Sequence, residues 1–96
     1  MTLETLLAID LPIIQAPMAG SQGSALAIAV SNAGGLGSLP CAMLGVEAMR
    51  KEIAAIRAGT AKPFNVNFFC HVPPVPDPAR ESAWRAALAP YFDEYG

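Results

Sequence analysis

The chain has 96 residues, which is enough for one small domain and no more. Of these residues 53% are hydrophobic and 15% are charged, an apolar composition for a chain that must cover so much surface. The net charge is −2 and the six basic residues do not cluster, which excludes the basic footprint that nucleic-acid binding requires. We therefore expect residues that belong to a larger folded body, without a nucleic-acid partner.

The two cysteines, Cys41 and Cys70, lie far apart and form no CxxC pair, so they indicate neither a zinc site nor a redox motif. Buried, reduced thiols are the expected state, and they fit a cytoplasmic protein. The N-terminus has no basic segment of the kind that opens a signal peptide. The longest apolar run, 11–19, contains two prolines and is too short to cross a bilayer, so we expect no membrane partner.

The first half of the chain alternates short apolar runs with one helical stretch. Residues 12–17 (PIIQAP) predict a first strand that is entered and left at prolines. Ser24 is the expected N-cap of a helix over 24–32, and two glycines follow this helix as a stop signal. Residues 35–39 predict a second short strand.

The clearest helix of the sequence comes next. Apolar residues at helical spacing define one stripe of it: Val46, Met49, Ile53 and Ile56. Gly59 lies where a C-terminal cap is expected, and residues 64–69 then predict a third strand.

A last helix is predicted after the proline-rich loop 70–76. Asp77 is its expected N-cap, with a proline in the first helical position. Trp84 and Leu88 share one face of this helix, which indicates a core position for the tryptophan rather than a cofactor contact. The helix should break near Pro90.

Three repeats of a strand followed by a helix predict an α/β fold with a parallel sheet and right-handed crossovers. Parallel sheets are covered on both faces or closed into barrels, and three βα units are the first part of a (β/α)8 TIM barrel of about 250 residues. The helix at 24–32 is apolar on all sides, so it requires more neighbours than this chain supplies. We expect residues 1–96 to be the incomplete N-terminal portion of a single TIM-barrel domain.

Ligands of parallel α/β proteins bind at the carboxyl ends of the strands. Three segments are predicted to lie there: 15–20, 38–41 and 67–71. The first is made of small residues around a rigid proline, so a flat ligand can approach its backbone closely. An ordinary strand exit has the same composition, and the segment alone does not distinguish the two.

The third strand carries a sharper signal. Alternation along a strand places Asn65 and Asn67 on one face and Phe64, Val66 and Phe68 on the other. If helices cover the phenylalanine face, Asn67 points into the barrel and can bind the polar edge of a ligand. The alternative is an asparagine that bonds to neighbouring backbone.

The remaining candidates favour structural roles. The glycine-rich stretch 32–37 fits neither dinucleotide nor P-loop phosphate motifs, and it precedes a strand rather than a helix. His71 is the single histidine and lies in a loop at the expected ligand face, but no second titratable group accompanies it at a useful spacing.

Three stretches carry a resemblance to a known family: PIIQAPM at 12–18, AVSNAGGLGS at 29–38 and KPFNVN at 62–67. In composition, order and spacing the chain resembles the start of nitronate monooxygenases, formerly called 2-nitropropane dioxygenases. The likeness continues through 69–71 and the helix after it, so it covers nearly the whole chain.

The resemblance implies a TIM-barrel flavoprotein that uses noncovalent FMN and O2 to oxidise alkyl nitronates to carbonyl compounds and nitrite. Transferred residue by residue, it places the backbone of Ala16, Pro17 and Met18 against the isoalloxazine ring and makes Asn67 the FMN-binding asparagine. The partners that it implies are a small-molecule nitronate, O2 and the remainder of the barrel or a further copy of the chain.

The chain also departs from the family pattern. The family's catalytic histidine lies much further along the chain than His71, and its phosphate-binding loops follow the later strands. No catalytic residue is therefore assigned here, and the 96 residues alone are expected to be inactive. Two alternatives stay open: a flavin-dependent enoyl reductase of the same superfamily, and a catalytically inactive, truncated βα product.

Overall fold

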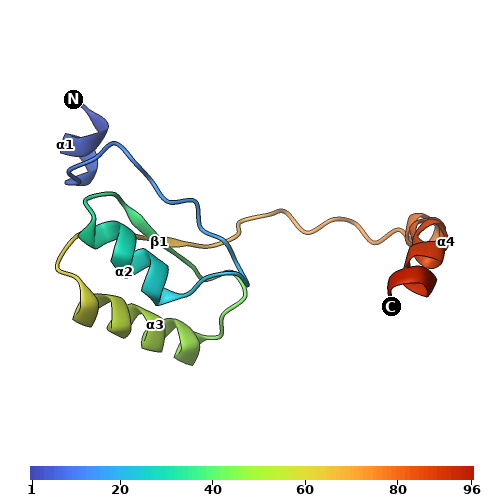
Figure 1. Cartoon of the computed structure of the whole chain (residues 1–96). Helices are drawn as coiled ribbons and strands as arrows, with labels where there is room; N and C mark the ends of the chain where they lie inside the picture. Colours follow the sequence, from blue (N-terminus) through green and yellow to red (C-terminus); the bar gives the residue numbers. More distant parts are fainter.

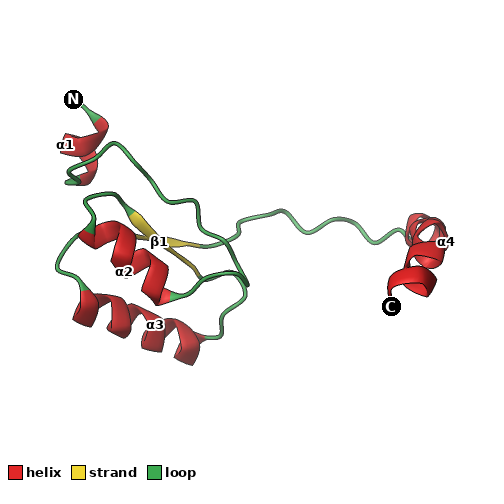
Figure 2. Cartoon of the chain, in the orientation of Figure 1, coloured by secondary structure: helices red, strands yellow, loops and turns green.

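The computed structural model describes residues 1–96 as four helices and two strands. In chain order these are α1 (Leu3–Leu7), α2 (Ser24–Asn32), β1 (Gly37–Pro40), α3 (Val46–Gly59), β2 (Phe64–Asn67) and α4 (Pro78–Tyr95). Figures 1 and 2 show a body formed by everything up to β2, and α4 at the far end of an extended segment. None of the helices combines the length and the apolar composition that a membrane crossing requires.

The strands β1 and β2 pair in parallel, with Ser38 opposite Asn65 and Pro40 opposite Asn67. The expected α/β fold with parallel strands is therefore present, but the sheet has two strands rather than three. The predicted first strand is reduced to a single parallel bridge between Ile14 and Leu36. After this bridge the region 12–17 turns away from the sheet, because its second proline, Pro17, has no N–H to continue the ladder.

Helices α2 and α3 lie side by side on one face of the strands (Figure 1). The buried apolar core between helices and sheet consists of Ala27, Leu39, Cys41 and Ile56. Phe64 and Val66 of β2 pack against this core. Because side chains alternate along a strand, Asn65 and Asn67 project from the opposite face, which no helix covers. The alternation predicted for the third strand is confirmed.

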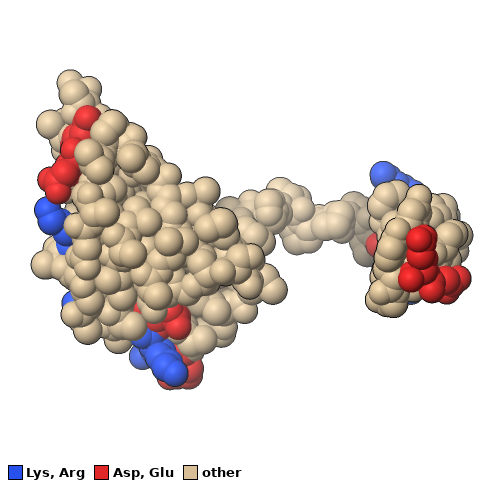
Figure 3. Space-filling view, viewed as in Figure 1, with Lys and Arg blue, Asp and Glu red and all other residues tan.

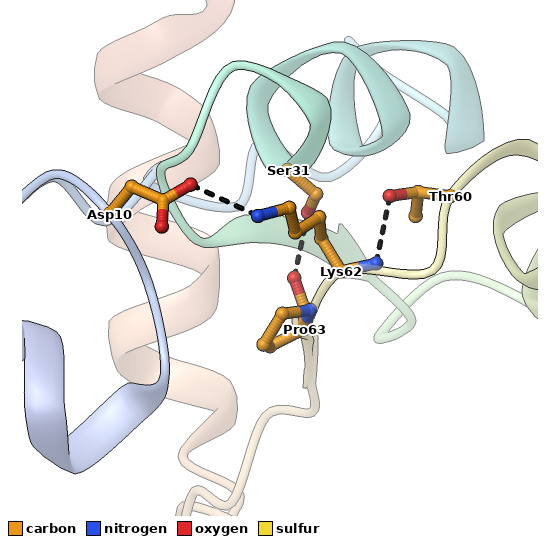
Figure 4. Close-up of polar contacts among 5 residues, drawn as sticks. All are labelled: Asp10, Ser31, Thr60, Lys62 and Pro63. Atoms are coloured by element: carbon orange, nitrogen blue, oxygen red, sulfur yellow. Dashed lines mark hydrogen bonds and ion pairs between the residues drawn. The ribbon is translucent and has the colours of Figure 1, made fainter.

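Helix α2 packs very closely on β1 because a glycine and a serine meet at the crossing. The Gly37 N–H donates to the buried Ser31 hydroxyl at 3.1 Å, and this hydroxyl donates to the Pro63 carbonyl at 2.8 Å. One serine thus ties α2 to the starts of both strands. Figure 4 shows this contact beside an exposed ion pair, in which the Lys62 amine lies 3.0 Å from the Asp10 carboxylate.

The helix ends differ from the predictions in two places. Gly23, not Ser24, is the N-cap of α2, and no side chain of the same segment caps this end. Thr60, not Gly59, is the C-cap of α3, and its backbone is extended. Gly59 is required for a different reason: a Cβ at this position would lie 2.7 Å from Cδ1 of Ile28. The glycine permits close packing of α3 on α2 rather than a left-handed turn.

The last helix begins as predicted and ends later. The Asp77 carboxylate accepts a hydrogen bond from the Arg80 N–H at 3.1 Å, which confirms the N-cap. The predicted break at Pro90 is wrong, because the helix continues to Tyr95 with the proline inside it. A proline removes only its own N–H from the helical ladder and kinks a helix more readily than it ends one.

The core position predicted for Trp84 is also wrong. Its side chain is 66% exposed, and α4 has no buried residue. Trp84 and Leu88 lie four residues apart on α4, and no other element of the chain lies against this helix (Figure 2). A short helix that the periodicity did not reveal, α1, opens the chain with Thr2 as its N-cap.

Substitution of Gly37 tests the close approach of α2 to β1. A Cβ at this position would overlap the Ala27 carbonyl and lie 2.6 Å from the Ser31 hydroxyl oxygen. We expect Gly37→Ala to lower the free energy of unfolding by about 3 kcal/mol, because the Ala27 carbonyl belongs to the α2 backbone and hydrogen bonds hold the Ser31 hydroxyl in place. Urea unfolding followed by circular dichroism measures this change.

The matched control is Gly45→Ala, since a Cβ at Gly45 meets nothing within 4 Å. Because Gly45 is the N-cap of α3, where alanine is less favourable than glycine, this variant should lose no more than about 1 kcal/mol. Equal stability of the two variants would contradict the packing described here.

Candidate cofactor-binding site

The helix-free face of the sheet forms the candidate site at the carboxyl ends of the strands. Gln15, Ser38 and Asn65 are joined there by hydrogen bonds, and Pro40 lies opposite Asn67 in the register. The loop after β1 also reaches this region, because a Cβ at position 20 would lie 3.8 Å from the Met43 sulfur. The structure thus brings together the predicted segments 15–20 and 38–41 and the start of 67–71.

The loop that follows Gln15 leaves the sheet because Pro17 cannot donate a hydrogen bond. The bridge at Leu36 uses two parallel ladder bonds, from Leu36 N–H to the Ile13 carbonyl and from Gln15 N–H to the Leu36 carbonyl, both 2.9 Å. The next bonds of a parallel ladder would join Ser38 to the carbonyl of residue 15 and the N–H of residue 17. A proline at 17 has no N–H, so the backbone ladder ends here.

Two glutamine side chains replace the missing backbone partners of Ser38. The Gln15 amide oxygen accepts from the Ser38 N–H at 3.0 Å, and the Gln22 amide nitrogen donates to the Ser38 carbonyl at 2.9 Å. The Gln15 amide nitrogen donates to the Gln22 amide oxygen, which also accepts from the Met18 N–H at 3.1 Å. Ser38 is completely buried beneath this network, which we call the glutamine pair.

The two asparagines of β2 are in different situations. Asn65 donates from its amide nitrogen to the Ser38 hydroxyl at 3.2 Å, so it belongs to the internal network. Asn67 is half-buried at the strand end, and its side-chain amide makes no hydrogen bond within the chain. The alternative of an asparagine bonded to neighbouring backbone is not what the structure shows for either residue. The Asn67 amide is the group on this face that is free to bind a ligand.

The loop 16–18 follows the segment that bridges β1 at Leu36, whereas Asn67 ends the strand paired with β1. Ala16 and Met18 are exposed, and Pro17 is half-buried. The Met18 N–H is bonded to Gln22, whereas the Ala16 N–H has no acceptor within the chain. A flat, partly polar ligand at the carboxyl ends of the strands could therefore use the free Ala16 N–H and the free Asn67 amide.

A carboxylate from α3 binds the first residue of α2, the helix that follows the loop 16–18 in the chain. Glu52 accepts a hydrogen bond from the Ser24 N–H at 2.7 Å, so it caps α2 from another helix. Hydrogen bonds from the hydroxyl and then the backbone N–H of Ser24 hold the pKa of Glu52 below its ordinary value of 4.5. The positive end of the helix dipole acts in the same direction. The carboxylate takes the role that the sequence suggested for the Ser24 side chain.

Cys41 supplies no reactive group at this site, and His71 lies on the exposed segment after β2. Cys41 is buried in the core, and burial raises the pKa of its thiol, which keeps it neutral and unreactive. Cys70 is exposed, so the expected burial is wrong for this cysteine, because the segment beyond β2 leaves the body. The exposed His71 ring packs on Phe69 with ring centroids 5.3 Å apart.

No charged side chain takes part in the hydrogen bonds that join Gln15, Ser38 and Asn65. In the view of Figure 3 the Lys, Arg, Asp and Glu residues of the body lie along its margins. No group of three or more His, Cys, Asp or Glu residues gathers in a metal-binding arrangement. The site therefore offers a ligand its surface shape and hydrogen bonds from backbone groups and side-chain amides.

Comparison with known proteins decides the family. The family model for nitronate monooxygenase matches residues 1–95, which is almost the entire chain. This chain belongs to the nitronate monooxygenase family. Curated nitronate monooxygenases of Paraburkholderia phytofirmans and Pseudomonas aeruginosa are each 56% identical to it over 91 residues, or 95% of the chain.

Solved structures agree with the family assignment. A nitroalkane oxidase from Streptomyces ansochromogenes matches 93% of the chain with a TM-score of 0.74 and 36% identity, and the match covers 26% of that protein. FabK from Thermotoga maritima matches 74% of the chain with a TM-score of 0.69 and 39% identity, over 23% of its own length. The chain spans about a quarter of the length of the curated nitronate monooxygenases that it matches, 25% and 26%.

Sequence reasoning did not find Gln22, which has more hydrogen-bond partners than any other side chain of the site. The signal that points to it is the combination of a predicted strand with Pro17 at its end. Such a proline leaves an unpaired carbonyl on the neighbouring strand, at Ser38, and a nearby amide side chain is needed to satisfy it.

The lowered pKa of Glu52 predicts how stability depends on pH. A carboxylate with a depressed folded-state pKa stabilises the fold above its ordinary pKa of 4.5, and this contribution is lost as the pH falls through the folded value. We expect Glu52→Gln to lower the free energy of unfolding at pH 7 by about 0.5–1 kcal/mol, with the difference from wild type vanishing at low pH. Urea unfolding between pH 7 and pH 3 measures this.

Glu94→Gln is the control, because Glu94 is exposed near the end of α4 and forms no ion pair. It should leave the pH profile of the wild type unchanged. A difference between wild type and Glu52→Gln that stays constant down to pH 3 would show that the charge of Glu52 does not stabilise α2.

Proposed function

We propose that this chain forms the first wall of the flavin site of an FMN-dependent nitronate monooxygenase, which oxidises alkyl nitronates with O2 to carbonyl compounds and nitrite. The observation that carries this proposal is the free, half-buried amide of Asn67 on the helix-free face of a parallel sheet. Membership of the nitronate monooxygenase family supports a flavin as the ligand of that face.

The residues of the face fit a flavin ring. The backbone of Ala16, Pro17 and Met18 supplies a flat surface against which the isoalloxazine ring would lie. The Asn67 amide offers both a donor and an acceptor for the polar edge of the ring. The Asn67 amide is half-buried, so a ligand hydrogen bond to it contributes about 0.5–1.5 kcal/mol net of the water that it displaces.

The tasks of this chain in the reaction are binding and orientation. The flavin, when bound, supplies the redox chemistry, since no side chain of this face can exchange electrons with a nitronate. The apolar core behind Ser38 keeps water from the rear of the site. The phosphate of the cofactor and the proton-accepting group of the reaction require residues outside this chain, and we propose that the 96 residues alone are inactive.

We further propose that residues 1–96 form the first three βα units of a (β/α)8 barrel. The outer edge of β2 has no neighbouring strand, and the helix-free face has no covering layer. Parallel sheets with one bare face are rare among folded proteins, and closure into a barrel supplies both missing contacts. The remainder of the barrel is then the principal partner of α4 and β2, with a nitronate and O2 as the small-molecule partners.

A chimera tests the proposal. The chain replaces the matching 91 residues of the Pseudomonas aeruginosa nitronate monooxygenase, to which it is 56% identical. We expect the purified chimera to retain FMN and to consume O2 with an alkyl nitronate. In this chimera Asn67→Ala should weaken FMN binding by about tenfold, which corresponds to one lost hydrogen bond to a buried group. Flavin fluorescence during equilibrium dialysis measures the affinity.

Asn32→Ala serves as the matched control, because the Asn32 amide donates to the Gly59 carbonyl on the exposed helical side. It should leave FMN affinity unchanged. An NADH-dependent enoyl reductase assay on the same sample tests the alternative activity. Enoyl reduction without nitronate oxidation would reject the proposed reaction, and a folded chimera without flavin would reject the site.

A further inference from the structure

We propose that Gln22 is a positioning residue, which sets the conformation of the flavin-facing loop 16–18 by completing the sheet that Pro17 interrupts. This inference rests on the proposed function for its link to FMN. It concerns a residue outside the three segments expected to contact the ligand. The supporting observations are the four hydrogen bonds of the Gln22 amide and the single backbone bond that otherwise restrains the loop.

The Gln22 amide joins parts of the site that the backbone leaves separate. Its nitrogen donates to the Ser38 carbonyl at 2.9 Å and to the Gly23 carbonyl at 3.3 Å. Its oxygen accepts from the Met18 N–H at 3.1 Å and from the Gln15 amide nitrogen. All donors and both acceptor positions of one half-buried side chain are thus in use.

The loop has little else to hold it in place. Between Ala16 and Gly20 the one backbone hydrogen bond is a turn, from the Ser21 N–H to the Met18 carbonyl at 3.1 Å. Without Gln22, the segment from Pro17 to Gly20 would be anchored to the sheet only at Gln15. A loop with so few bonds samples several conformations, and a flavin would have to select one of them at a cost in affinity.

The polarity of the glutamine pair is fixed by Ser38. The Ser38 N–H requires an acceptor, so Gln15 must present its oxygen, and the Gln15 nitrogen then requires an acceptor from Gln22. The Gln22 nitrogen is left facing the Ser38 carbonyl, which is the one arrangement without two like groups in contact. A carboxylate at position 22 breaks this order, because it would place a charged oxygen against two carbonyls.

The arrangement also decides which backbone donor a flavin can use. The Met18 N–H is already bound to Gln22, whereas the Ala16 N–H is free. Gln22 thereby holds the loop in the one conformation that turns the Met18 N–H inward and leaves Ala16 available. Its effect on the cofactor is exerted through the loop, without contact with the ring.

Amide hydrogen exchange on the intact 96-residue chain, followed by NMR, tests this role. The variants are Gln22→Ala, which removes the amide, and Gln22→Glu, which keeps its shape and replaces its NH2 donor with a charged oxygen. We expect exchange of the Met18 N–H to accelerate by about tenfold or more in both variants, while the Ile56 N–H in the core is unchanged. Ser21→Ala is the control, because Ser21 is exposed and its hydroxyl makes no hydrogen bond.

Two results would overturn the proposal. Exchange at Met18 that stays at the wild-type rate in Gln22→Ala would show that the amide does not hold the loop. Equal acceleration at Met18 and Ile56 would show a general loss of stability rather than positioning.

FMN binding by the chimera separates this inference from the proposed function, because the chimera supplies the residues outside this chain that the cofactor phosphate requires. We expect Gln22→Glu to weaken FMN binding by the chimera about fivefold, measured by equilibrium dialysis. Equal FMN affinity of the chimera with and without this substitution would overturn the link between Gln22 and the cofactor. Faster Met18 exchange in the 96-residue variants, together with a folded chimera that binds no flavin, would retain the loop assignment and contradict the flavin site.

Discussion

The parallel pairing of β1 and β2, covered by helices on one face only, is the constraint from which the candidate site follows. Helices α2 and α3 pack on the face that carries Leu39 and Val66, and this packing fixes the opposite face for Asn65 and Asn67. The close approach depends on the absence of a side chain at Gly37, where α2 backbone lies directly above the strand. A small core of four buried residues thereby determines the direction in which the polar end of β2 points.

On the helix-free face, the free edge of β1 at Ser38 has its backbone hydrogen-bond partners within the chain. Pro17 ends the backbone ladder, and the glutamine pair supplies both partners of Ser38 that a third strand would have provided. The strand edge is thus closed with side chains, and the loop 16–18 is free to rise above the sheet instead of continuing along it. Pro17 ends the strand, and Gln22 binds the Ser38 carbonyl that is left without a backbone partner. Together they produce a loop surface suited to a flat ligand.

Much of this could be predicted from residue patterns, and the largest failures concern contacts between residues that are distant in sequence. Alternation in β2 and the N-cap at Asp77 depend on local rules, and the structure confirms both. The burial of Trp84 and Cys70 depends on partners outside the segment 68–96, and local sequence carries no information about whether those partners are present. The glutamine pair was missed because it joins residues that are 7 and 16 positions apart through a backbone carbonyl, a contact with no periodic signature.

A crystal structure of the FMN-loaded chimera tests most directly whether the cofactor binds on the helix-free face. We expect the isoalloxazine ring to lie against the backbone of Ala16–Met18, with the Asn67 amide within about 3.2 Å of a polar atom of the ring. A flavin bound elsewhere in the barrel, or an Asn67 amide turned toward its own strand with the ring out of reach, would contradict it.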